Sequence, residues 1–187
     1  MSPIDCVVFD LGNVLIRWDP RLLYRQLLPD DAAVEAFLAE VDFPAFNHRL
    51  DAAELPWDAA IAEMAERHPH RSALIAAYRE RFRDSLGGVI EGTVEIVREL
   101  HDQGVRLLAL TNWSHETFEL ARDDMPFLKF FEGVVVSGVE QVAKPDPRIF
   151  HLLIDRYALD PARTVFVDDN PPNVAAAAAV GLRAVQF

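Results

Sequence analysis

Short runs of aliphatic and β-branched residues recur along the chain without regular polar alternation. The runs occupy residues 6–9, 105–110, 133–136, 164–167 and 183–185. Such runs are typical of strands that are buried on both faces of a parallel sheet. Segments with helical spacing lie between them, at 93–103, 147–157 and 172–180. The alternation of strand and helix predicts an α/β fold with a Rossmann-like, doubly wound parallel sheet.

One large gap interrupts this alternation, from about residue 17 to residue 86. No buried strand is evident there, and amphipathic helical patterns occupy 20–28, 32–41, 53–68 and 71–82. Asp19-Pro20 has the features of a helix start, with Asp as the N-cap and Pro at the first helical position. We therefore predict a helical cap of residues 18–86, inserted into a catalytic core of residues 1–17 and 87–187. The simpler alternative is a set of helices that pack on a sheet face and have no functional role.

Composition narrows the class of partner. The 187 residues include 18 Lys and Arg and 30 Asp and Glu, which gives a net charge of −12. Such a surface repels phosphate backbones and anionic membranes, so we expect no nucleic-acid or membrane partner. A single cysteine, Cys6, cannot form an internal disulfide and suits a reducing compartment. We expect a cytoplasmic monomer or homodimer.

Two apolar stretches require a check for targeting and membrane segments. The stretch at 1–16 is interrupted by Asp5 and Asp10 and has no basic leader, so we expect no signal peptide. The stretch Val174–Leu182 is far shorter than the roughly 20 residues that cross a bilayer.

Polar side chains follow four of the predicted strands, at the points where the strands end: Asp10, Thr111-Asn112, Lys144 and Asp168-Asp169. Ligands bind outside the carboxyl ends of the strands in an open parallel sheet. Three carboxylates that converge there repel one another, and a hard cation such as Mg²⁺ relieves the repulsion while leaving room for a substrate phosphate. Lysine and hydroxyl groups can hold phosphate oxygens, and an Asp carboxylate can act as the nucleophile. The pattern predicts a phosphoryl-transfer site.

These residues resemble a known family. Phe9-Asp10-Leu11-Gly12-Asn13-Val14-Leu15, Leu110-Thr111-Asn112, Lys144-Pro145 and Val167-Asp168-Asp169 are similar to the four ordered motifs of the haloacid dehalogenase-like superfamily, and together they span essentially the whole chain. The resemblance implies a Rossmann-like core with a helical cap. It also implies a Mg²⁺-dependent phosphatase that acts on a small phosphate ester through a phospho-aspartate intermediate.

Roles follow from the resemblance position by position. Asp10 corresponds to the nucleophile and to a metal ligand, and the backbone carbonyl of Gly12 to a second ligand. Asp168 and Asp169 correspond to the acidic metal-binding pair. The hydroxyl of Thr111 and the ammonium of Lys144 correspond to groups that bind the phosphate and assist catalysis, and we place Asn112 with them as a substrate-binding residue.

Gly12 departs from the family pattern. Family phosphatases usually carry a second Asp there, which protonates the leaving group and later activates water. General acid–base assistance contributes about 10²–10⁴-fold, so its loss favours substrates with an acidic leaving oxygen, such as sugar 1-phosphates, aryl phosphates or acyl phosphates. The Phe-Asp-Leu-Gly-Asn-Val segment is also similar to a bacterial subgroup that includes glucose-1-phosphate phosphatases, which makes a sugar phosphate one candidate.

Two alternatives remain open. A 2-haloacid dehalogenase also lacks the second Asp and has a motif similar to Thr111-Asn112. It carries small hydroxyl residues, however, where this chain has Asp168-Asp169, and the position of its late Asp is Asn173 here. The other alternative is a regulatory protein that binds phosphate but lost turnover with Gly12. The sequence leaves the substrate and the replacement acid undetermined. The cap candidates for facing the substrate are Arg17, Phe46, Asn47, His48 and Arg49.

Overall fold

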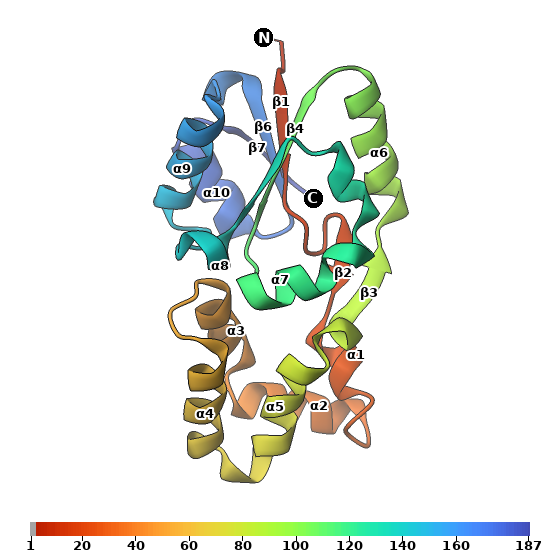
Figure 1. Ribbon diagram of the computed structural model, residues 1–187, viewed down its shortest axis with the longest axis vertical. Helices are drawn as coiled ribbons and strands as arrows, with labels where there is room; N and C mark the ends of the chain where they lie inside the picture. The colour runs from red at the N-terminus through yellow and green to blue at the C-terminus, as the bar shows by residue number, and fades with distance from the viewer. Residues whose placement is uncertain (1–2) are drawn as a thin grey trace.

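A computed structural model describes residues 3–187 of the chain, and its centre is a parallel five-stranded sheet (Figure 1). The strand order is β5-β4-β1-β6-β7. The strands are β1 (Cys6–Phe9), β4 (Arg106–Thr111), β5 (Gly133–Val136), β6 (Thr164–Asp168) and β7 (Arg183–Gln186). All five runs that predicted strands form them, and the predicted α/β fold with a doubly wound parallel sheet is confirmed. Residues 1 and 2 of the predicted core segment 1–17 lie outside the described residues.

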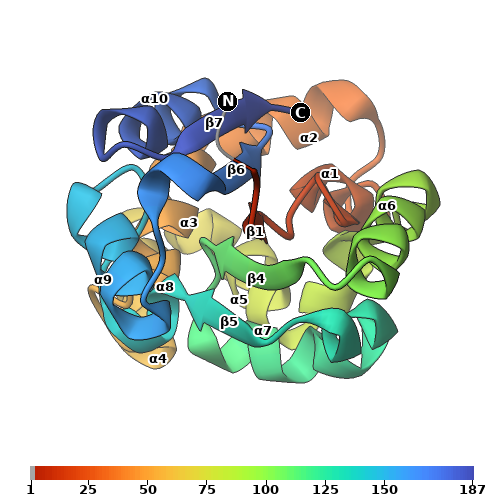
Figure 2. The same ribbon diagram turned by 90° about the horizontal axis from the view of Figure 1, so that it is seen from above.

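Helices cover both faces of this sheet (Figure 2). Helix α6 (Glu91–Asp102) lies on one face, and α9 (Pro147–Tyr157) and α10 (Pro171–Ala179) lie on the other. In β1, Val7 and Phe9 belong to the hydrophobic cluster on the α6 side, whereas Val8 belongs to the cluster beneath α9 and α10. Burial on both faces explains why the strand has no polar alternation.

The remaining elements of the sheet region are short. Helices α7 (His115–Ala121) and α8 (Ser137–Glu140) directly follow the ends of β4 and β5. Single 3-10 turns occupy Pro69–Arg71, Phe82–Ser85, Arg122–Asp124, Pro126–Phe130 and Pro161–Arg163. No helix of residues 3–187 has the length and apolar character needed to cross a lipid bilayer.

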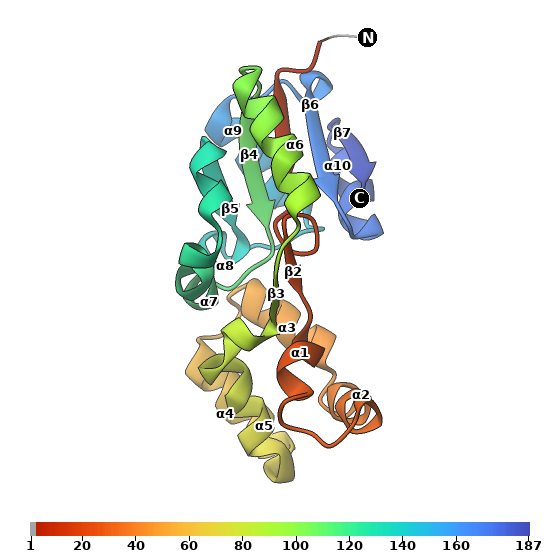
Figure 3. The same ribbon diagram turned by 90° about the vertical axis from the view of Figure 1, so that its right-hand side faces the viewer.

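The long predicted helical segment forms five helices beyond the carboxyl ends of the strands (Figure 3). They are α1 (Pro20–Tyr24), α2 (Asp31–Glu40), α3 (Phe43–Asp51), α4 (Trp57–Arg67) and α5 (Ser72–Glu80), and we call them the helical insert. Asp19 caps α1 as predicted, because its side chain accepts the Arg21 N–H. Helix α3 is not among the predicted patterns. Pro44 interrupts that stretch of sequence, yet Pro is well tolerated in the first turn of a helix.

A two-stranded antiparallel ribbon connects the sheet to the helical insert (Figure 3). It consists of β2 (Ile16–Trp18) and β3 (Leu86–Val89). Gly87 permits the close approach of the two strands, because a Cβ there would lie only 3.0 Å from the Arg17 Cβ. Half of β3 is glycine and the ribbon is partly exposed, so its pattern does not have the apolar character of a buried strand.

Aromatic rings join the helical insert to the sheet region. Ring centroids lie 5.6 Å apart for Trp57 and Tyr78, 5.7 Å for Tyr78 and Phe82, and 5.8 Å for Phe82 and Trp113. Trp57 Nε1 also donates a hydrogen bond to Ser114 Oγ at 2.5 Å. These contacts hold the insert over the loop that follows β4.

Candidate active site

The loop that follows β1 places the carboxylate of Asp10 at the carboxyl edge of the sheet. The Asp10 N–H still donates to Val167 O at 2.8 Å, which continues the strand pairing by one residue. Asp10 Oδ1 accepts the Leu11 N–H at 2.8 Å. Asn13 adopts a left-handed backbone conformation (φ 55°), which Asn tolerates better than most residues. The chain therefore turns sharply beyond Asp10, and the Asp10 carboxylate stays at the end of β1, where it lines a cavity.

Lys144 lies between two of the carboxylates. Its Nζ is 3.0 Å from Asp10 Oδ1, 2.6 Å from Asp168 Oδ2 and 2.9 Å from Leu110 O. The side chains of Lys144 and Asp168 have no exposed surface. An ammonium group has three protons, so these three acceptors satisfy it completely. Lys144 thereby offsets the two carboxylates, which burial alone would destabilise.

Asn112 fixes the backbone that carries this lysine. Its Nδ2 donates to Lys144 O and its Oδ1 accepts the Lys144 N–H, both at 2.8 Å. Asn112 was predicted to bind substrate. Both ends of its amide have partners in the protein, so in this structure it holds the Lys144 segment against the end of β4.

The two acidic residues after β6 have different surroundings. Asp168 Oδ1 accepts the Asn170 N–H at 2.8 Å and Asn173 Nδ2 at 3.0 Å, so both oxygens of this carboxylate have hydrogen-bond donors. Asp169 is half-buried and lines the cavity described below. Among residues 3–187, Asn173 Oδ1 is the one buried side-chain N or O atom without a hydrogen-bond partner. An unpartnered acceptor and a carboxylate thus line the same cavity.

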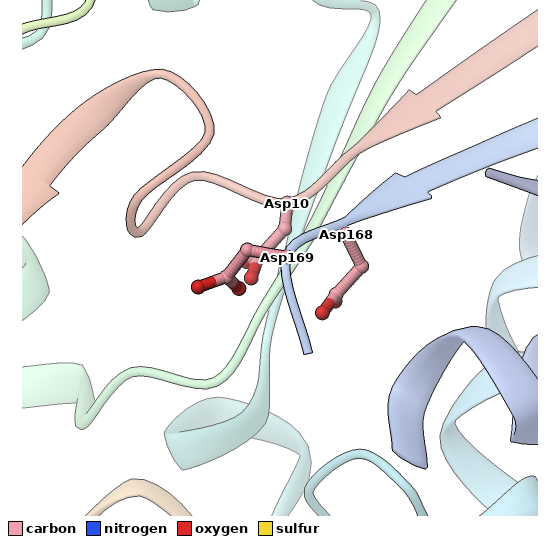
Figure 4. Close-up of side chains that lie close together, drawn as sticks. All are labelled: Asp10, Asp168 and Asp169. Atoms are coloured by element: carbon pink, nitrogen blue, oxygen red, sulfur yellow. The ribbon is translucent and has the colours of Figure 1, made fainter. Parts of the chain in front are cut away.

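The carboxylates of Asp10, Asp168 and Asp169 converge (Figure 4). Each offers an oxygen, and these oxygens lie within 4.8 Å of one another. Burial raises the pKa of Asp10 to about 6, although Lys144 opposes the rise. Burial and the charge of Asp168 also raise the pKa of Asp169 above its usual value. An all-oxygen donor set of this kind fits a hard cation such as Mg²⁺, which would relieve the repulsion.

A cavity of about 320 Å³ lies in front of these groups. The sheet region contributes Asp10, Gly12, Asn13, Thr111, Asn112, Trp113, Asp169, Asn170 and Asn173 to its lining, and Trp18, Asn47, Asp51, Tyr78 and Phe82 complete it from the ribbon, the insert and the turn after it. Five of the seven predicted site residues therefore line one cavity. Lys144 and Asp168 lie directly behind Asp10. The structure brings all seven together, and the chemical role of each remains a prediction.

Among the predicted cap candidates, Asn47 is the one that lines this cavity. Phe46 is buried in the hydrophobic cluster, and Arg49 pairs with Glu63 at 3.0 Å. Arg17 donates to Val89 O across the ribbon, and His48 lines a neighbouring cavity.

Asp51, the last residue of α3, is a site residue that the sequence analysis missed. Its Oδ1 accepts the Ser114 N–H at 3.1 Å, and its Oδ2 accepts Asn47 Nδ2 at 2.7 Å. The Tyr78 hydroxyl donates to Asn47 Oδ1 at 2.6 Å. Burial raises the pKa of Asp51 to about 7. The available signal was the spacing of Asn47 and Asp51, four residues apart, which puts both on one face of a helix.

A second cavity, of about 490 Å³, adjoins the first and shares Trp18, Asn47 and Asp51 with it. The rest of its lining is Pro20, Arg21, Glu35, Leu38, Ala39, Phe43, Pro44 and His48. Apolar side chains of the ribbon, α2 and α3 make most of this wall. The two cavities together offer a polar end at the carboxylates and an apolar end within the helical insert.

A family model for haloacid dehalogenase-like hydrolases matches residues 4–181, a range that includes all four strand-end motifs. The chain belongs to the haloacid dehalogenase-like hydrolase family. The family predicted from the motifs is thereby confirmed, while the narrower subgroup with glucose-1-phosphate phosphatases stays a prediction.

Two relatives align with nearly the whole of this hydrolase. It is 27% identical over 183 residues to the sesquiterpene phosphatase astK of Aspergillus oryzae, an alignment that covers 97% of this chain and 88% of the relative. It is 29% identical to the phosphoserine phosphatase of Thermus thermophilus, with 96% of this chain and 86% of the relative covered.

Solved structures of the family share the fold. A HAD-like family hydrolase from Porphyromonas gingivalis superposes with a TM-score of 0.78 at 23% identity, covering 99% of this chain and 91% of that one. A HAD-family enzyme from Bacteroides thetaiotaomicron, in complex with magnesium, superposes with a TM-score of 0.76 at 17% identity. The superposition covers 100% of this chain and 94% of that one. The L-2-haloacid dehalogenase of Xanthobacter autotrophicus superposes with a TM-score of 0.70 at 17% identity, covering 98% of this chain and 77% of that one. The fold is thus common to enzymes with different reactions, so the reaction must be inferred from the site.

Proposed function

We propose that this hydrolase is a Mg²⁺-dependent phosphatase that acts on a small phosphate ester through a phospho-aspartate at Asp10. The observation that carries the proposal is the convergence of three carboxylates and the buried Lys144 at the polar end of one cavity. A substrate phosphate and a cation together would balance this charge. Both full-length relatives are named as phosphatases, which supports the proposal.

The residues present fit a magnesium ion. Asp10, the Gly12 carbonyl and the Asp168-Asp169 pair would hold it, with Asp169 as the member of the pair whose oxygens face the cavity. The unpartnered Asn173 Oδ1 would suit a water molecule of the ion's hydration shell. When bound, Mg²⁺ supplies charge neutralisation for the transferring phosphoryl group.

The reaction follows from how Asp10 is held. Its Oδ1 accepts hydrogen bonds from Leu11 and Lys144, so Oδ2 is the oxygen that attacks phosphorus in line. The bond between phosphorus and the leaving oxygen breaks, and that oxygen takes a proton. Water then attacks the phospho-aspartate, which releases inorganic phosphate and regenerates the Asp10 carboxylate. Thr111, which lines the cavity, would hold a phosphoryl oxygen during both steps, and Lys144, whose Nζ lies 3.0 Å from Asp10 Oδ1, would hold the nucleophile in place.

We propose that residues 18–86 act as a cap over a catalytic core of residues 1–17 and 87–187. Side chains of the helical insert complete the cavity wall, and so this cap would exclude bulk water and select the organic group of the substrate. A cytoplasmic location remains our proposal. It accords with the lone Cys6, which is buried within β1 and has a free thiol.

The organic group of the substrate has two candidates. The sequence favours a sugar phosphate with an acidic leaving oxygen. The adjoining apolar cavity favours a phosphate ester with a hydrocarbon group instead, because Leu38, Phe43 and Pro44 offer such a group a surface away from water. The sesquiterpene phosphatase among the relatives supports this second candidate.

A panel assay tests the proposal. Phosphate release is measured from sugar, amino-acid, prenyl and aryl phosphates, with Mg²⁺ and after chelation by EDTA, for the wild type and for Asp10→Asn. We expect release by the wild type with Mg²⁺ alone, and no turnover by a folded Asp10→Asn variant. Halide release from a 2-haloacid that persists in EDTA would show a dehalogenase. Tight phosphate binding without release from any ester would show a regulatory protein.

A further inference from the structure

The loop after Asp10 leaves empty the place where a proton donor would stand. A Cβ built on Gly12 would have no heavy atom within 4 Å, and Gly12 itself lines the cavity. The proposed reaction nevertheless requires a proton for the leaving oxygen and a base for the attacking water. A group that serves both needs must therefore reach the cavity from another element.

Asp51 reaches this cavity from the helical insert. It is the only Asp or Glu that the helical insert contributes to the cavity lining, within the described residues 3–187. Asp51 is half-buried and lines the cavity, and its carboxylate contacts Asn47 of the insert and Ser114 after β4. The N–H of Ser114, which Asp51 accepts, lies three residues after Thr111. Asp51 thus lies beside the predicted phosphate-binding segment and lines the same cavity as Asp10.

The hydrogen bonds around Asp51 allow both of its protonation states. As a carboxylate it accepts from Ser114 N and Asn47 Nδ2. Rotation of the Asn47 amide by half a turn would present its oxygen to a protonated Asp51 and its NH₂ to the Tyr78 oxygen. An amide that can face either way stabilises the acid and its conjugate base in turn.

We infer that Asp51 is the catalytic acid and base of this enzyme, in the role that Gly12 cannot fill; the inference rests on the proposed phosphatase function. The Asp51 carboxyl gives its proton to the leaving oxygen as the bond from that oxygen to phosphorus breaks, and an alcohol departs. The resulting carboxylate then takes a proton from the water that attacks the phospho-aspartate. The Asp51 carboxyl loses one proton in the first step and regains one in the second, so it is protonated again at the end of each cycle.

The electrostatic surroundings agree with this assignment. Burial raises the pKa of Asp51 to about 7, although the hydrogen bonds from Ser114 and Asn47 oppose the rise; the charge of Asp10 contributes to the rise and that of Lys144 opposes it. The cavities that Asp51 lines also include Tyr78 of α5, Asp169 after β6, and Arg21, Glu35 and His48 of the insert. An acid whose pKa lies near neutrality can both donate and accept a proton during one turnover.

The test is a leaving-group series. We measure kcat/KM for alkyl, phenyl, 4-nitrophenyl and 2,4-dinitrophenyl phosphates with Mg²⁺, for the wild type and Asp51→Asn. A good leaving group needs no proton, so we expect a loss of about 10²–10⁴-fold on the alkyl ester and less than about 10-fold on the dinitrophenyl ester. Asp51→Ala, which places no second amide opposite Asn47, is the parallel variant and should give the same pattern.

Trp57→Phe is the matched control. It removes the indole N–H bond to Ser114 Oγ, so it loosens the contact between insert and sheet region but retains the Asp51 carboxyl. We expect Trp57→Phe to lower kcat/KM by the same factor for all four esters, because a loosened cap does not discriminate between leaving groups. The same uniform loss in Asp51→Asn, with a normal wild-type enzyme, would overturn the acid–base role and leave the phosphatase proposal standing. A wild type that releases phosphate from none of the esters would overturn both.

Discussion

The ammonium of Lys144 lies 2.6 Å from Asp168 Oδ2, and neither side chain has any surface exposed to solvent. Breaking a buried ion pair by removing one partner leaves the other charge uncompensated. Here the uncompensated charge would be Asp168, with Asp10 close by. This pair therefore links the stability of the core to the placement of the nucleophile.

Substituting Lys144 should lower both the stability of the core and the rate of phosphate release. We expect Lys144→Met to lower the free energy of unfolding by about 3–5 kcal/mol and to reduce phosphate release at least about 10²-fold. Urea unfolding and the Mg²⁺-dependent assay measure the two effects. Arg156→Met is the control, since Arg156 pairs with Glu140 at 2.7 Å but is 42% exposed, and such pairs contribute about 1 kcal/mol or less. A Lys144→Met protein with wild-type stability and turnover would contradict this account.

Returning an acid to the loop after β1 should rescue a protein that lacks Asp51. The open space around Gly12 accommodates the side chain of Gly12→Asp. In the wild type we expect little gain, because Asp51 already supplies the proton. In the Asp51→Asn background we expect Gly12→Asp to restore kcat/KM for the alkyl ester at least about 10-fold. Gly12→Asn in the same background is the matched control, and equal rescue by both variants would show that the effect is not proton transfer.

The sequence predicted the parts of this molecule that local pattern determines. Unbroken apolar runs identified the sheet, and the polar residues that follow four of the five runs identified the carboxylates and Lys144, because the ends of parallel strands share one edge. Helix α3 was missed since Pro44 interrupts its pattern, and the ribbon was missed since glycine makes up half of β3. With α3 absent from the prediction, the four-residue spacing of Asn47 and Asp51 could not be interpreted as one face of a helix.

Asp51 also shows why site residues on an inserted segment escape sequence analysis. Its hydrogen bond to Ser114 joins residues 63 positions apart. No periodicity relates the two, because the contact depends on how the insert lies over the sheet. Asn112 shows a related limit. Its position in a motif predicted a substrate ligand, which stays a prediction because the residue lines the cavity, and the motif gave no sign that its amide also pairs with the backbone of Lys144.

The pH dependence of activity should report the Asp51 carboxyl. The acid must be protonated to assist the leaving group, so kcat/KM for the alkyl ester should fall as the pH rises through about 7, the pKa that burial gives Asp51. For the dinitrophenyl ester, and for Asp51→Asn on either ester, this fall should be absent. The facing charges of Asp10 and Lys144 are common to both proteins. An unchanged alkaline limb in Asp51→Asn would assign that limb to another group.

Stability should depend on pH through the same group. Asp51 keeps its proton in the folded protein up to about pH 7, whereas in the unfolded chain it loses the proton near its ordinary pKa of 3.8. The folded state therefore binds more protons between these values, and wild-type stability should fall as the pH rises through that window. The free energy of unfolding of Asp51→Asn, minus that of the wild type, should increase by up to about 1.4 kcal/mol per pH unit there. Asp155→Asn, at an exposed site on α9, is the control and should show no such trend.

The apolar cavity of the insert gives the final prediction, which concerns the organic group of the substrate. Ala39 is exposed on α2 and lines this cavity, so Ala39→Phe would partly fill it at little cost to the fold. If a hydrocarbon group occupies the cavity, the variant should raise KM for a prenyl phosphate about 10-fold or more, because a buried CH₂ contributes about 0.8 kcal/mol. It should leave KM for a sugar phosphate unchanged.

Ala36→Phe is the matched control, since Ala36 is also exposed on α2 but does not line the cavity. Both variants carry the same ring on the same helix, so a difference between them isolates the cavity from any effect on helix stability. Steady-state kinetics on the two esters measure that difference. Equal KM values for prenyl phosphate in the two variants would exclude the cavity as the binding site of the hydrocarbon group, and a KM increase for the sugar ester in Ala39→Phe alone would place the sugar there instead.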